Sequence, residues 1–295
     1  MLLLKLHQKS ISLLLLLVIS IFCYKALAST PSSNITVLAN TKSQLHQNYI
    51  NTLLKKTKQH LEIKDYQQKL ATDSKFIITV GNIACQKAIA TYKKKYILCT
   101  LLPSFEFSRL AQGINKKNLI VGAIYIDQPY SRRLNFIKEY FPAVKKIAII
   151  KSDNNPISHP VEHNDKILVN TYTVENFQEI LRLLSHINDN NDAILATEDK
   201  LVYNNKTIRQ ILLLSYRKEM PIIAFSKNFV KAGAAASIYS TIDDLTQEVN
   251  EIINSYTNNT NYRLEAKHPK YYTTSFNEEV IQALAIPTSK RADRE

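Results

Sequence analysis

Polar and charged side chains stand where the apolar runs that predict strands come to an end. Parallel strands of α/β proteins bring their carboxyl ends to one edge of the sheet, and ligands bind there. Carboxylates at that edge can hold an ammonium group, and helix starts attract a carboxylate or another anion. The candidate ligand-binding residues are Thr41, Asn82, Thr100, Asp127, Asp153, Glu198, Asp199, Ser226 and Tyr239.

Within this set, Asn82 and the pair Glu198 and Asp199 are the strongest candidates. The two acidic residues suit an ammonium group, while Asn82 and Ser226 stand at predicted helix starts that suit an anion. The alternative is that these side chains only cap helices and form turns. The pattern therefore predicts a site for a zwitterion such as an amino acid.

A second pattern, His159-Pro160-Val161-Glu162-His163, matches the H-x-x-E-H signature of zinc hydrolases. That chemistry needs both histidines one turn apart on a stable helix, together with a third ligand. Here the motif lies in a stretch rich in Asn, Asp and Pro, and no companion glutamate motif is evident. We therefore expect no metal site, no catalytic residues and no cofactor, and an exported zinc hydrolase is the least favoured function.

The first 28 residues have the pattern of a secretory signal peptide. Lys5 and Lys9 precede an apolar run from Ile11 to Phe22, and Ala26-Leu27-Ala28 offers a small-x-small cleavage site before Ser29. The alternatives are an uncleaved anchor, although the run is shorter than the ~20 residues of a spanning helix, and lipidation at Cys23. Cleavage predicts that the mature protein works outside the cytoplasm.

Export also governs how the charge and the cysteines are interpreted. The chain carries a formal net charge of +13, which in a cytoplasmic protein would suggest nucleic acid. Outside the cytoplasm we expect no nucleic-acid partner, and a solvated basic face is the simpler interpretation.

Cys85 and Cys99 remain after cleavage, at predicted strand and helix ends that share one sheet edge. They are either a disulfide or two buried thiols.

Glycine is too rare for nucleotide-binding loops. The chain has 4 glycines, and none lies close enough to another to form a phosphate-binding loop or a dinucleotide fingerprint. Proteins that bind nucleotides through clustered glycines are thereby excluded.

Strand and helix patterns alternate along the whole mature chain, and the strands are continuous apolar runs. Such runs are typical of parallel sheets covered on both faces by helices. Two series of this alternation, separated at 127–129, predict an α/β protein with two Rossmann-like lobes facing each other across a cleft. The expected strands are 35–39, 61–63, 76–80, 96–99, 119–125, 146–150, 166–172, 193–196, 222–225 and 235–239. The expected helices are 45–59, 84–92, 104–111, 130–140, 174–187, 205–219, 242–256 and 276–284.

Several segments resemble a known family. They are Tyr125 to Pro129, Phe141 to Ile150, Thr197 to Asn204, Met220 to Ala234, and Phe276-Asn277 with Ala283 to Pro287. Their order is similar to that of ABC-transporter substrate-binding proteins of the tryptophan/tyrosine-binding (TrpX-like) type, over essentially the whole mature chain. The resemblance implies a type I periplasmic-binding-protein fold with a multi-strand hinge, and no catalysis.

The resemblance implies a periplasmic solute-binding protein that closes its lobes over a small polar, amino-acid-like molecule and delivers it to a membrane permease. The alternative is a periplasmic sensor that reports to a membrane histidine kinase or a cyclic-dinucleotide signalling protein. We expect a signal peptide at 1–28, lobe 1 at 29–127 with about 231–258, and lobe 2 at 128–230 with about 259–295.

The hinges are expected where the chain passes between these lobes, near Asp127–Pro129, Lys227–Ala232 and Asn258–Tyr262.

Overall fold

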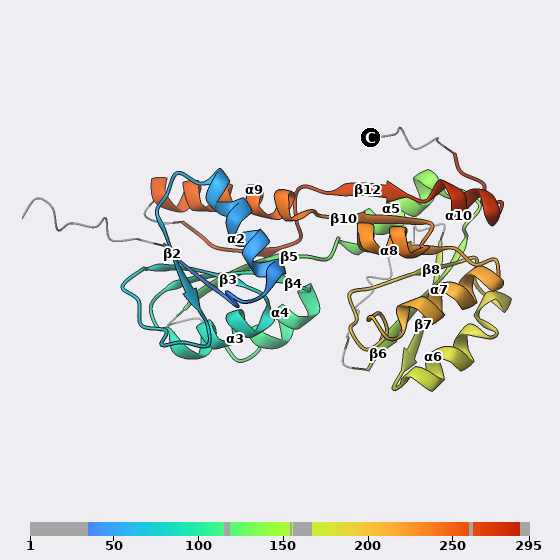
Figure 1. Ribbon diagram of the computed structural model, residues 1–295, viewed down its shortest axis with the longest axis horizontal. Coiled ribbons are helices and arrows are strands. Elements are labelled where there is room, and N and C mark those ends of the chain that lie inside the picture. The colour runs from blue at the N-terminus through green and yellow to red at the C-terminus, as the bar shows by residue number, and fades with distance from the viewer. Residues whose placement is uncertain (1–34, 115–118, 154, 156–166, 260–261, 290–295) are drawn as a thin grey trace, which may run out of the picture.

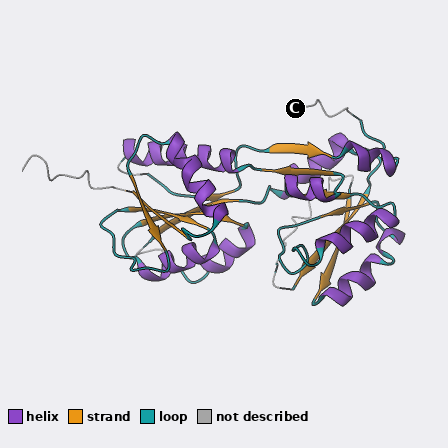
Figure 2. Ribbon diagram, in the orientation of Figure 1, coloured by secondary structure: helices purple, strands orange, loops and turns teal. Residues whose placement is uncertain are grey.

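The computed structural model describes residues 35–114, 119–153, 155, 167–259 and 262–289 (Figures 1 and 2). The expected signal peptide and the His159–His163 motif both lie outside these ranges. Within them, the chain forms two sheets with helices on both faces of each, which we call lobe 1 and lobe 2. None of the helices in these ranges combines the length and the apolar character needed to cross a bilayer.

Lobe 1 is built on a six-stranded sheet in which every neighbouring pair is parallel. Its strand order is β11-β5-β4-β3-β1-β2. The strands are β1 (Ile35–Ala39), β2 (Leu61–Asp65), β3 (Phe76–Val80), β4 (Tyr96–Leu102), β5 (Ile120–Tyr125) and β11 (Ala266–Lys267). The helices are α2 (Gln44–Lys56), α3 (Asn82–Thr91), α4 (Ser104–Ala111) and α9 (Ile242–Asn258).

Lobe 2 has a second six-stranded sheet, which is parallel except for β12, the antiparallel partner of β10. Its strand order is β12-β10-β9-β8-β6-β7. The strands are β6 (Lys146–Ser152), β7 (Leu168–Val174), β8 (Ala193–Leu195), β9 (Ile222–Ala224), β10 (Ala236–Tyr239) and β12 (Thr273–Phe276). The helices are α5 (Tyr130–Tyr140), α6 (Phe177–Leu184), the short η1 (Ile187–Asp189), α7 (Ile208–Arg217), α8 (Lys227–Ala232) and α10 (Glu278–Ala283).

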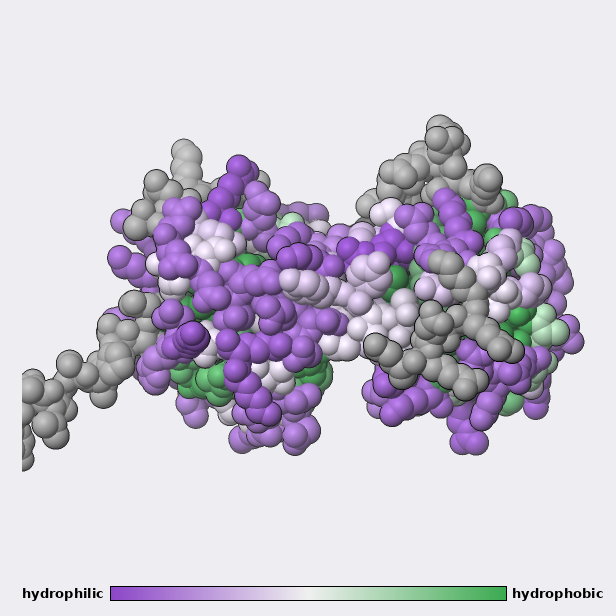
Figure 3. All heavy atoms as spheres, turned by 90° about the horizontal axis from the view of Figure 1, so that it is seen from above, coloured by the Kyte–Doolittle hydropathy of each residue, from purple (hydrophilic) through white to green (hydrophobic). Residues whose placement is uncertain are grey.

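Each sheet is sandwiched between two hydrophobic clusters. In lobe 1, α2 and α9 cover one face around Tyr49 and Val249, while α3 and α4 cover the other. In lobe 2, α6 and α7 cover one face, and α5 with α10 covers the other around Phe141. The continuous burial of β1 and β3 agrees with the prediction of strands covered on both faces. Hydrophilic residues cover most of the face that Figure 3 shows.

The chain crosses between the lobes three times, at 126–129, 240–241 and 268–272 (Figure 1). Hydrogen bonds join all three crossings. Gln128 Nε2 donates to Ser240 Oγ at 2.9 Å, and Ser240 Oγ donates to the Tyr271 carbonyl at 2.5 Å. Arg132 Nη1 adds bonds to Gln128 Oε1 at 2.6 Å and to the Pro269 carbonyl at 2.8 Å. We refer to these three crossings as the hinge.

The crossings correct the expected lobe boundaries and two of the expected hinges. β10, expected in lobe 1, pairs with β9 and β12 in lobe 2. The later segment β11, expected in lobe 2, pairs with β5 in lobe 1. Because each sheet receives its last strand from the C-terminal part of the chain, simple strand–helix alternation could not show where the crossings fall.

The hinge expected at 227–232 is the helix α8, and the one expected at 258–262 precedes the third crossing instead of forming it. Similarly, the expected helix at 276–284 is shorter, because its first residue belongs to β12. The remaining expected elements appear with shifts of a few residues at their ends.

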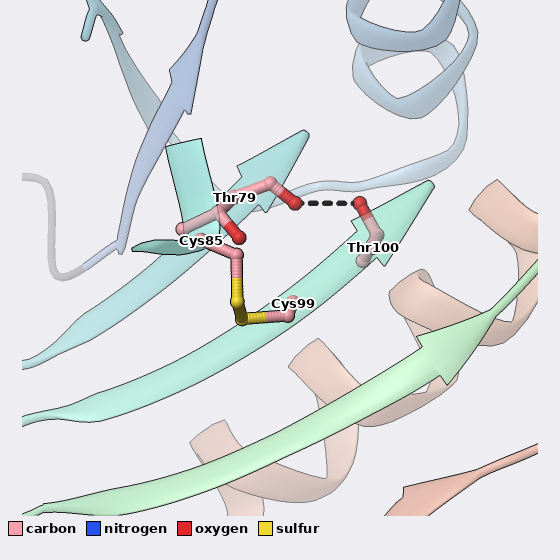
Figure 4. The surroundings of a disulfide bond; sticks show 4 residues. All are labelled: Thr79, Cys85, Cys99 and Thr100. Atoms are coloured by element: carbon pink, nitrogen blue, oxygen red, sulfur yellow. Dashed lines mark hydrogen bonds between the residues drawn. A yellow bond between two sulfur atoms is a disulfide. The ribbon is translucent and has the colours of Figure 1, made fainter. Parts of the chain in front are cut away.

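Cys85 of α3 and Cys99 of β4 form a disulfide whose Cα atoms are 5.4 Å apart. The structure therefore contains the first of the two alternatives that the sequence left open. Both residues are fully buried, and the adjacent Thr100 Oγ1 donates to the Thr79 carbonyl at 2.7 Å (Figure 4). The bond fixes the start of α3 to the strand beside it.

We expect the double variant Cys85→Ala, Cys99→Ala to lose about 2–4 kcal/mol of unfolding free energy. The disulfide closes a short loop, since its residues are 14 apart, and its loss gives the unfolded chain more conformational freedom. Urea unfolding of the oxidised protein and the variant measures the difference. Reduced wild-type protein is the control, and equal midpoints for all three samples would contradict a stabilising role.

Candidate functional site

Two cavities lie where the lobes face each other, and each is lined by residues of both lobes. The hinge cavity has a volume of about 390 Å³ and lies beside the first crossing. Its lining residues are Ser104, Phe105, Ser108, Asp127, Gln128, Tyr130, Arg133, Ile149, Asn155, Thr197, Glu198 and His268. Because its walls come from both lobes, any ligand held there would contact the two lobes at once.

The strand-end cavity is larger, about 630 Å³, and lies at the carboxyl ends of β1 and β3. Apolar walls come from Leu101 of lobe 1, from Ile126 of the first crossing, and from Tyr203 and Phe225 of lobe 2. Its polar lining residues include Asn40, His46, Asn82, Glu106, Glu198 and Lys200. Glu198 lines both cavities and therefore joins them.

The start of α3 forms one wall of the strand-end cavity. Gly81, at the N-cap with φ of +89°, has no side chain to cap the first turn, whose free N–H groups favour an acceptor or an anion. A Cβ at Gly81 would lie 3.2 Å from the His46 ring. Asn82 Oδ1 is buried and has no hydrogen-bond partner among the described residues. This end of the helix therefore offers both donors and an acceptor to a ligand.

His46 is a neutral donor at the same wall. Its Nδ1 accepts a hydrogen bond from the Asn40 backbone N–H at 3.0 Å, so the ring proton is on Nε2. Partial burial lowers the pKa of His46, although the Asp65 carboxylate acts in the opposite direction. At neutral pH the imidazole can donate to a ligand without adding a charge.

Glu198 is the acidic residue whose ionisation the site perturbs most clearly. Burial between the lobes raises its pKa to about 7 from the ordinary 4.5. The nearby Arg133 guanidinium opposes this rise, and the Asp127 carboxylate adds to it. Glu198 therefore changes its charge near neutral pH and can present a carboxyl or a carboxylate to a ligand.

Three polar side chains of lobe 2 have unsatisfied atoms at the hinge cavity. Arg133, in α5, is buried; its Nη2 donates to the Ala196 carbonyl, while its Nε has no partner among the described residues. Asn155 Oδ1 and Thr197 Oγ1 are likewise buried and unpartnered in those ranges. Buried polar atoms of folded proteins are nearly always hydrogen-bonded, so this cluster indicates a place for a polar ligand or water.

The structure brings three of the nine predicted residues, Asn82, Asp127 and Glu198, to the cavities. Asp127 is already engaged, because its carboxylate accepts from the Ser104 backbone N–H and hydroxyl, both at 2.6 Å. His268 Nδ1 lies 3.6 Å from its Oδ2. Both oxygens of Asp127 are thus already hydrogen-bonded to Ser104, so we expect this residue to line the hinge cavity without binding the ligand strongly.

Asp199, predicted to act with Glu198, lies outside both cavities. Its Oδ2 accepts from the Ser152 N–H and hydroxyl at 2.7 and 2.8 Å, and its Oδ1 accepts from the Leu201 N–H at 3.0 Å. The buried carboxylate thus joins the end of β6 to the turn after β8. It positions Glu198 and Lys200 beside it.

The other predicted residues also lie outside the cavity linings. Thr41 donates to Asp65, Thr100 donates to Thr79, and Ser226 caps α8 by accepting from the Phe229 N–H. Asp153 is exposed after β6, and Tyr239 ends β10 beside the second crossing.

Arg133, Glu106 and Thr197 are candidate site residues that line the cavities but were not predicted from strand ends. Arg133 and Glu106 belong to helices, whereas the prediction considered only residues that follow strands. Thr197 lies two residues after β8 and directly before the acidic pair Glu198 and Asp199, which was the predicted ligand-binding pair. Across the described ranges, no group of three or more metal-ligating side chains occurs.

We expect Glu198→Gln to stabilise the protein at pH 8 by about 1–3 kcal/mol and to have no effect near pH 4. The raised folded-state pKa means that the folded protein holds a proton which the unfolded chain releases between pH 4.5 and about 7. The unfolding free energy of the wild-type protein therefore falls, relative to that of the variant, as the pH rises from 4.5 to about 7. Urea unfolding of both proteins at pH 4, 6 and 8 measures this difference.

The matched control for this measurement is Glu175→Gln at an exposed carboxylate. A difference between wild-type protein and Glu198→Gln that did not change with pH would contradict the raised pKa.

Comparison with solved structures finds the same two-lobed arrangement. The ABC domain in complex with L-Trp from Streptococcus pneumonia has a TM-score of 0.60 and 15% identity, over 86% of this chain and 94% of that one. The ligand-free, open form of a substrate-binding protein with adhesive properties from Clostridium difficile has a TM-score of 0.64 and 15% identity, over 88% and 96%. A conserved domain protein from Vibrio cholerae gives 0.61 and 15%, also over 88% and 96%.

At these identities the likeness shows the fold, an α/β architecture of the type I periplasmic-binding-protein kind. No curated protein matches the chain. The family model for ABC transporter substrate binding protein matches residues 29–255, which is most of the chain. Members of this family bind solutes outside the cytoplasm for a transporter and are not enzymes. The chain belongs to the ABC transporter substrate-binding protein family.

Proposed function

We propose that this protein is a periplasmic receptor that binds a small, amino-acid-like zwitterion in the joined hinge and strand-end cavities. The unsatisfied buried atoms carry this proposal. Lobe 1 contributes Asn82 Oδ1 and Glu106 Oε2, and lobe 2 contributes Arg133 Nε, Asn155 Oδ1 and Thr197 Oγ1. A polar ligand that paired with atoms of both lobes would hold them together, as hinge closure requires.

The charges around the cavities favour a ligand that carries both signs. Arg133 supplies a buried positive charge to the hinge cavity, and Glu106 supplies a nearly buried negative charge to the strand-end cavity. Glu198 lines both cavities, and its pKa, raised to about 7 by burial, allows either a carboxyl or a carboxylate there near neutral pH. The strand-end cavity has aromatic walls at Tyr203 and Phe225 and an aliphatic wall at Leu101, which suit an apolar side chain. An amino acid combines these features.

The solved structure with L-Trp is consistent with this ligand class, although the resemblance to the tryptophan/tyrosine-binding type remains a proposal at 15% identity. The first 28 residues support export with cleavage before Ser29. We infer that a membrane permease of the transporter receives the ligand from the closed protein.

We expect at least one compound in a panel of amino acids, purines, polyamines and sugars to raise the unfolding temperature. A ligand at about 100 times its dissociation constant adds ~2.7 kcal/mol, which corresponds to about 2–4 °C for a protein of this size. The hit should be a zwitterion. A sugar as the best ligand would contradict the amino-acid-like class, and a well-folded sample without any hit would contradict the receptor function.

With that ligand, we expect Thr197→Val to weaken binding about tenfold, because it removes a hydroxyl that the ligand would pair with in a buried site. Tyr239→Phe is the matched control, since Tyr239 lies outside both cavities. Isothermal titration calorimetry measures both affinities. If the two variants bound equally well, or if Tyr239→Phe were the weaker, our assignment of the site would be wrong.

A further inference from the structure

An ion pair reaches from one lobe to the other across the strand-end cavity. Lys200 Nζ, on the turn after β8 in lobe 2, lies 3.5 Å from Glu106 Oε1, in α4 of lobe 1. Both residues line the cavity. Apart from the three crossings, it is the one ion pair between lobes that the structure shows within its described ranges. It therefore bears directly on how the lobes close.

The two partners are very unequal in burial. The Lys200 side chain is 78% exposed, whereas the Glu106 side chain is 9% exposed. The second oxygen of Glu106, Oε2, is buried without any hydrogen-bond partner among the described residues. A long exposed lysine at 3.5 Å is a weak match for a carboxylate that has lost most of its water. Glu106 can therefore form stronger bonds with a better-placed donor.

Other acceptors of the strand-end cavity favour the same kind of donor. Asn82 Oδ1 and the Tyr203 hydroxyl are both buried and unpartnered in the described ranges. A primary ammonium has three N–H donors and needs acceptors such as these. The cavity thus supplies a carboxylate and two neutral oxygens for one protonated amine.

We propose that the Glu106 carboxylate binds the protonated amine of the ligand. When the ligand is absent, Lys200 occupies this position, so it competes with the ligand and acts as a latch between the lobes. The identity of the amine rests on the proposed function. The latch does not, because it requires only the contact between Lys200 and Glu106.

The position of Lys200 suits this role. The preceding residue, Asp199, is fixed by three hydrogen bonds from Ser152 and Leu201, so the backbone that carries Lys200 is held in place. Its side chain remains exposed and can swing away. A tethered ammonium competes at high effective concentration. A ligand must therefore displace Lys200, and a ligand without an amine has no means of doing so.

The latch can be tested without any ligand by measuring the distance between the lobes. Spin labels at Asn51→Cys on α2 and Gln210→Cys on α7 occupy exposed positions of lobe 1 and lobe 2. The protein used is residues 29–295, which lacks Cys23 and whose two native cysteines, Cys85 and Cys99, form the disulfide. Pulsed electron paramagnetic resonance then gives the interlobe distance distribution. We expect Lys200→Met and Glu106→Gln each to shift it toward longer distances, and the double variant to add nothing further.

Lys206→Met, at an exposed lysine of the same lobe, is the control for loss of charge. If Lys200→Met and Glu106→Gln left the distances unchanged, or if Lys206→Met changed them equally, the latch would be overturned. Lys200 is exposed, so its variant folds even if Glu106→Gln does not.

The amine subsite is tested with butylamine hydrochloride, with butan-1-ol as the neutral probe of matched size. We expect Lys200→Met to bind butylamine about fivefold more tightly than wild-type protein, because the internal competitor is gone. Glu106→Gln should lose this binding, and butan-1-ol should bind none of the three. Titrations followed by thermal unfolding measure the affinities.

Butylamine binding that survived in Glu106→Gln, or no gain in Lys200→Met, would overturn the amine subsite. If no natural ligand were found, the proposed function would be contradicted. The interlobe distances measured without ligand would still show whether the latch exists.

Discussion

The hydrogen-bonded hinge is the constraint on which the rest of the structure depends. Gln128, Ser240 and the Tyr271 carbonyl join the three crossings in one continuous chain of bonds. Because these bonds hold the three crossings together, they form a single strip that connects the two lobes. In this structure the lobes face each other beside that strip, and residues of both lobes line the same two cavities.

Among the described residues, several buried polar atoms without hydrogen-bond partners gather around that space. Elsewhere strand-end groups are used internally, as Asp199 is by Ser152 and Leu201. Between the lobes, Arg133 Nε and Glu106 Oε2 remain buried without partners in the described ranges. Each buried polar atom without a hydrogen-bond partner lowers the free energy of unfolding. A ligand that forms hydrogen bonds with these atoms would remove this loss of stability. A ligand that paired with these atoms would contact both lobes at once.

Much of the fold could be predicted from the sequence, because buried parallel strands such as β1 and β3 are short uninterrupted apolar runs. The lobe membership of β10 and β11 could not, since it depends on long-range pairing that no local pattern encodes. At the candidate site, the expectation that strand ends face the cleft agrees with the positions of Asn82 and Glu198 in the cavity walls. Arg133 and Glu106 were missed because their helices turn them inward, and only packing between elements determines that direction.

The central claim is that one ligand contacts both lobes in the joined cavities, and a crystal structure with the ligand found by the thermal panel tests it most directly. Our account predicts ligand atoms within hydrogen-bond distance of Arg133 or Thr197 in lobe 2 and of Glu106 or Asn82 in lobe 1, with Glu198 between them. A ligand held by one lobe alone, or bound outside the two cavities, would contradict it.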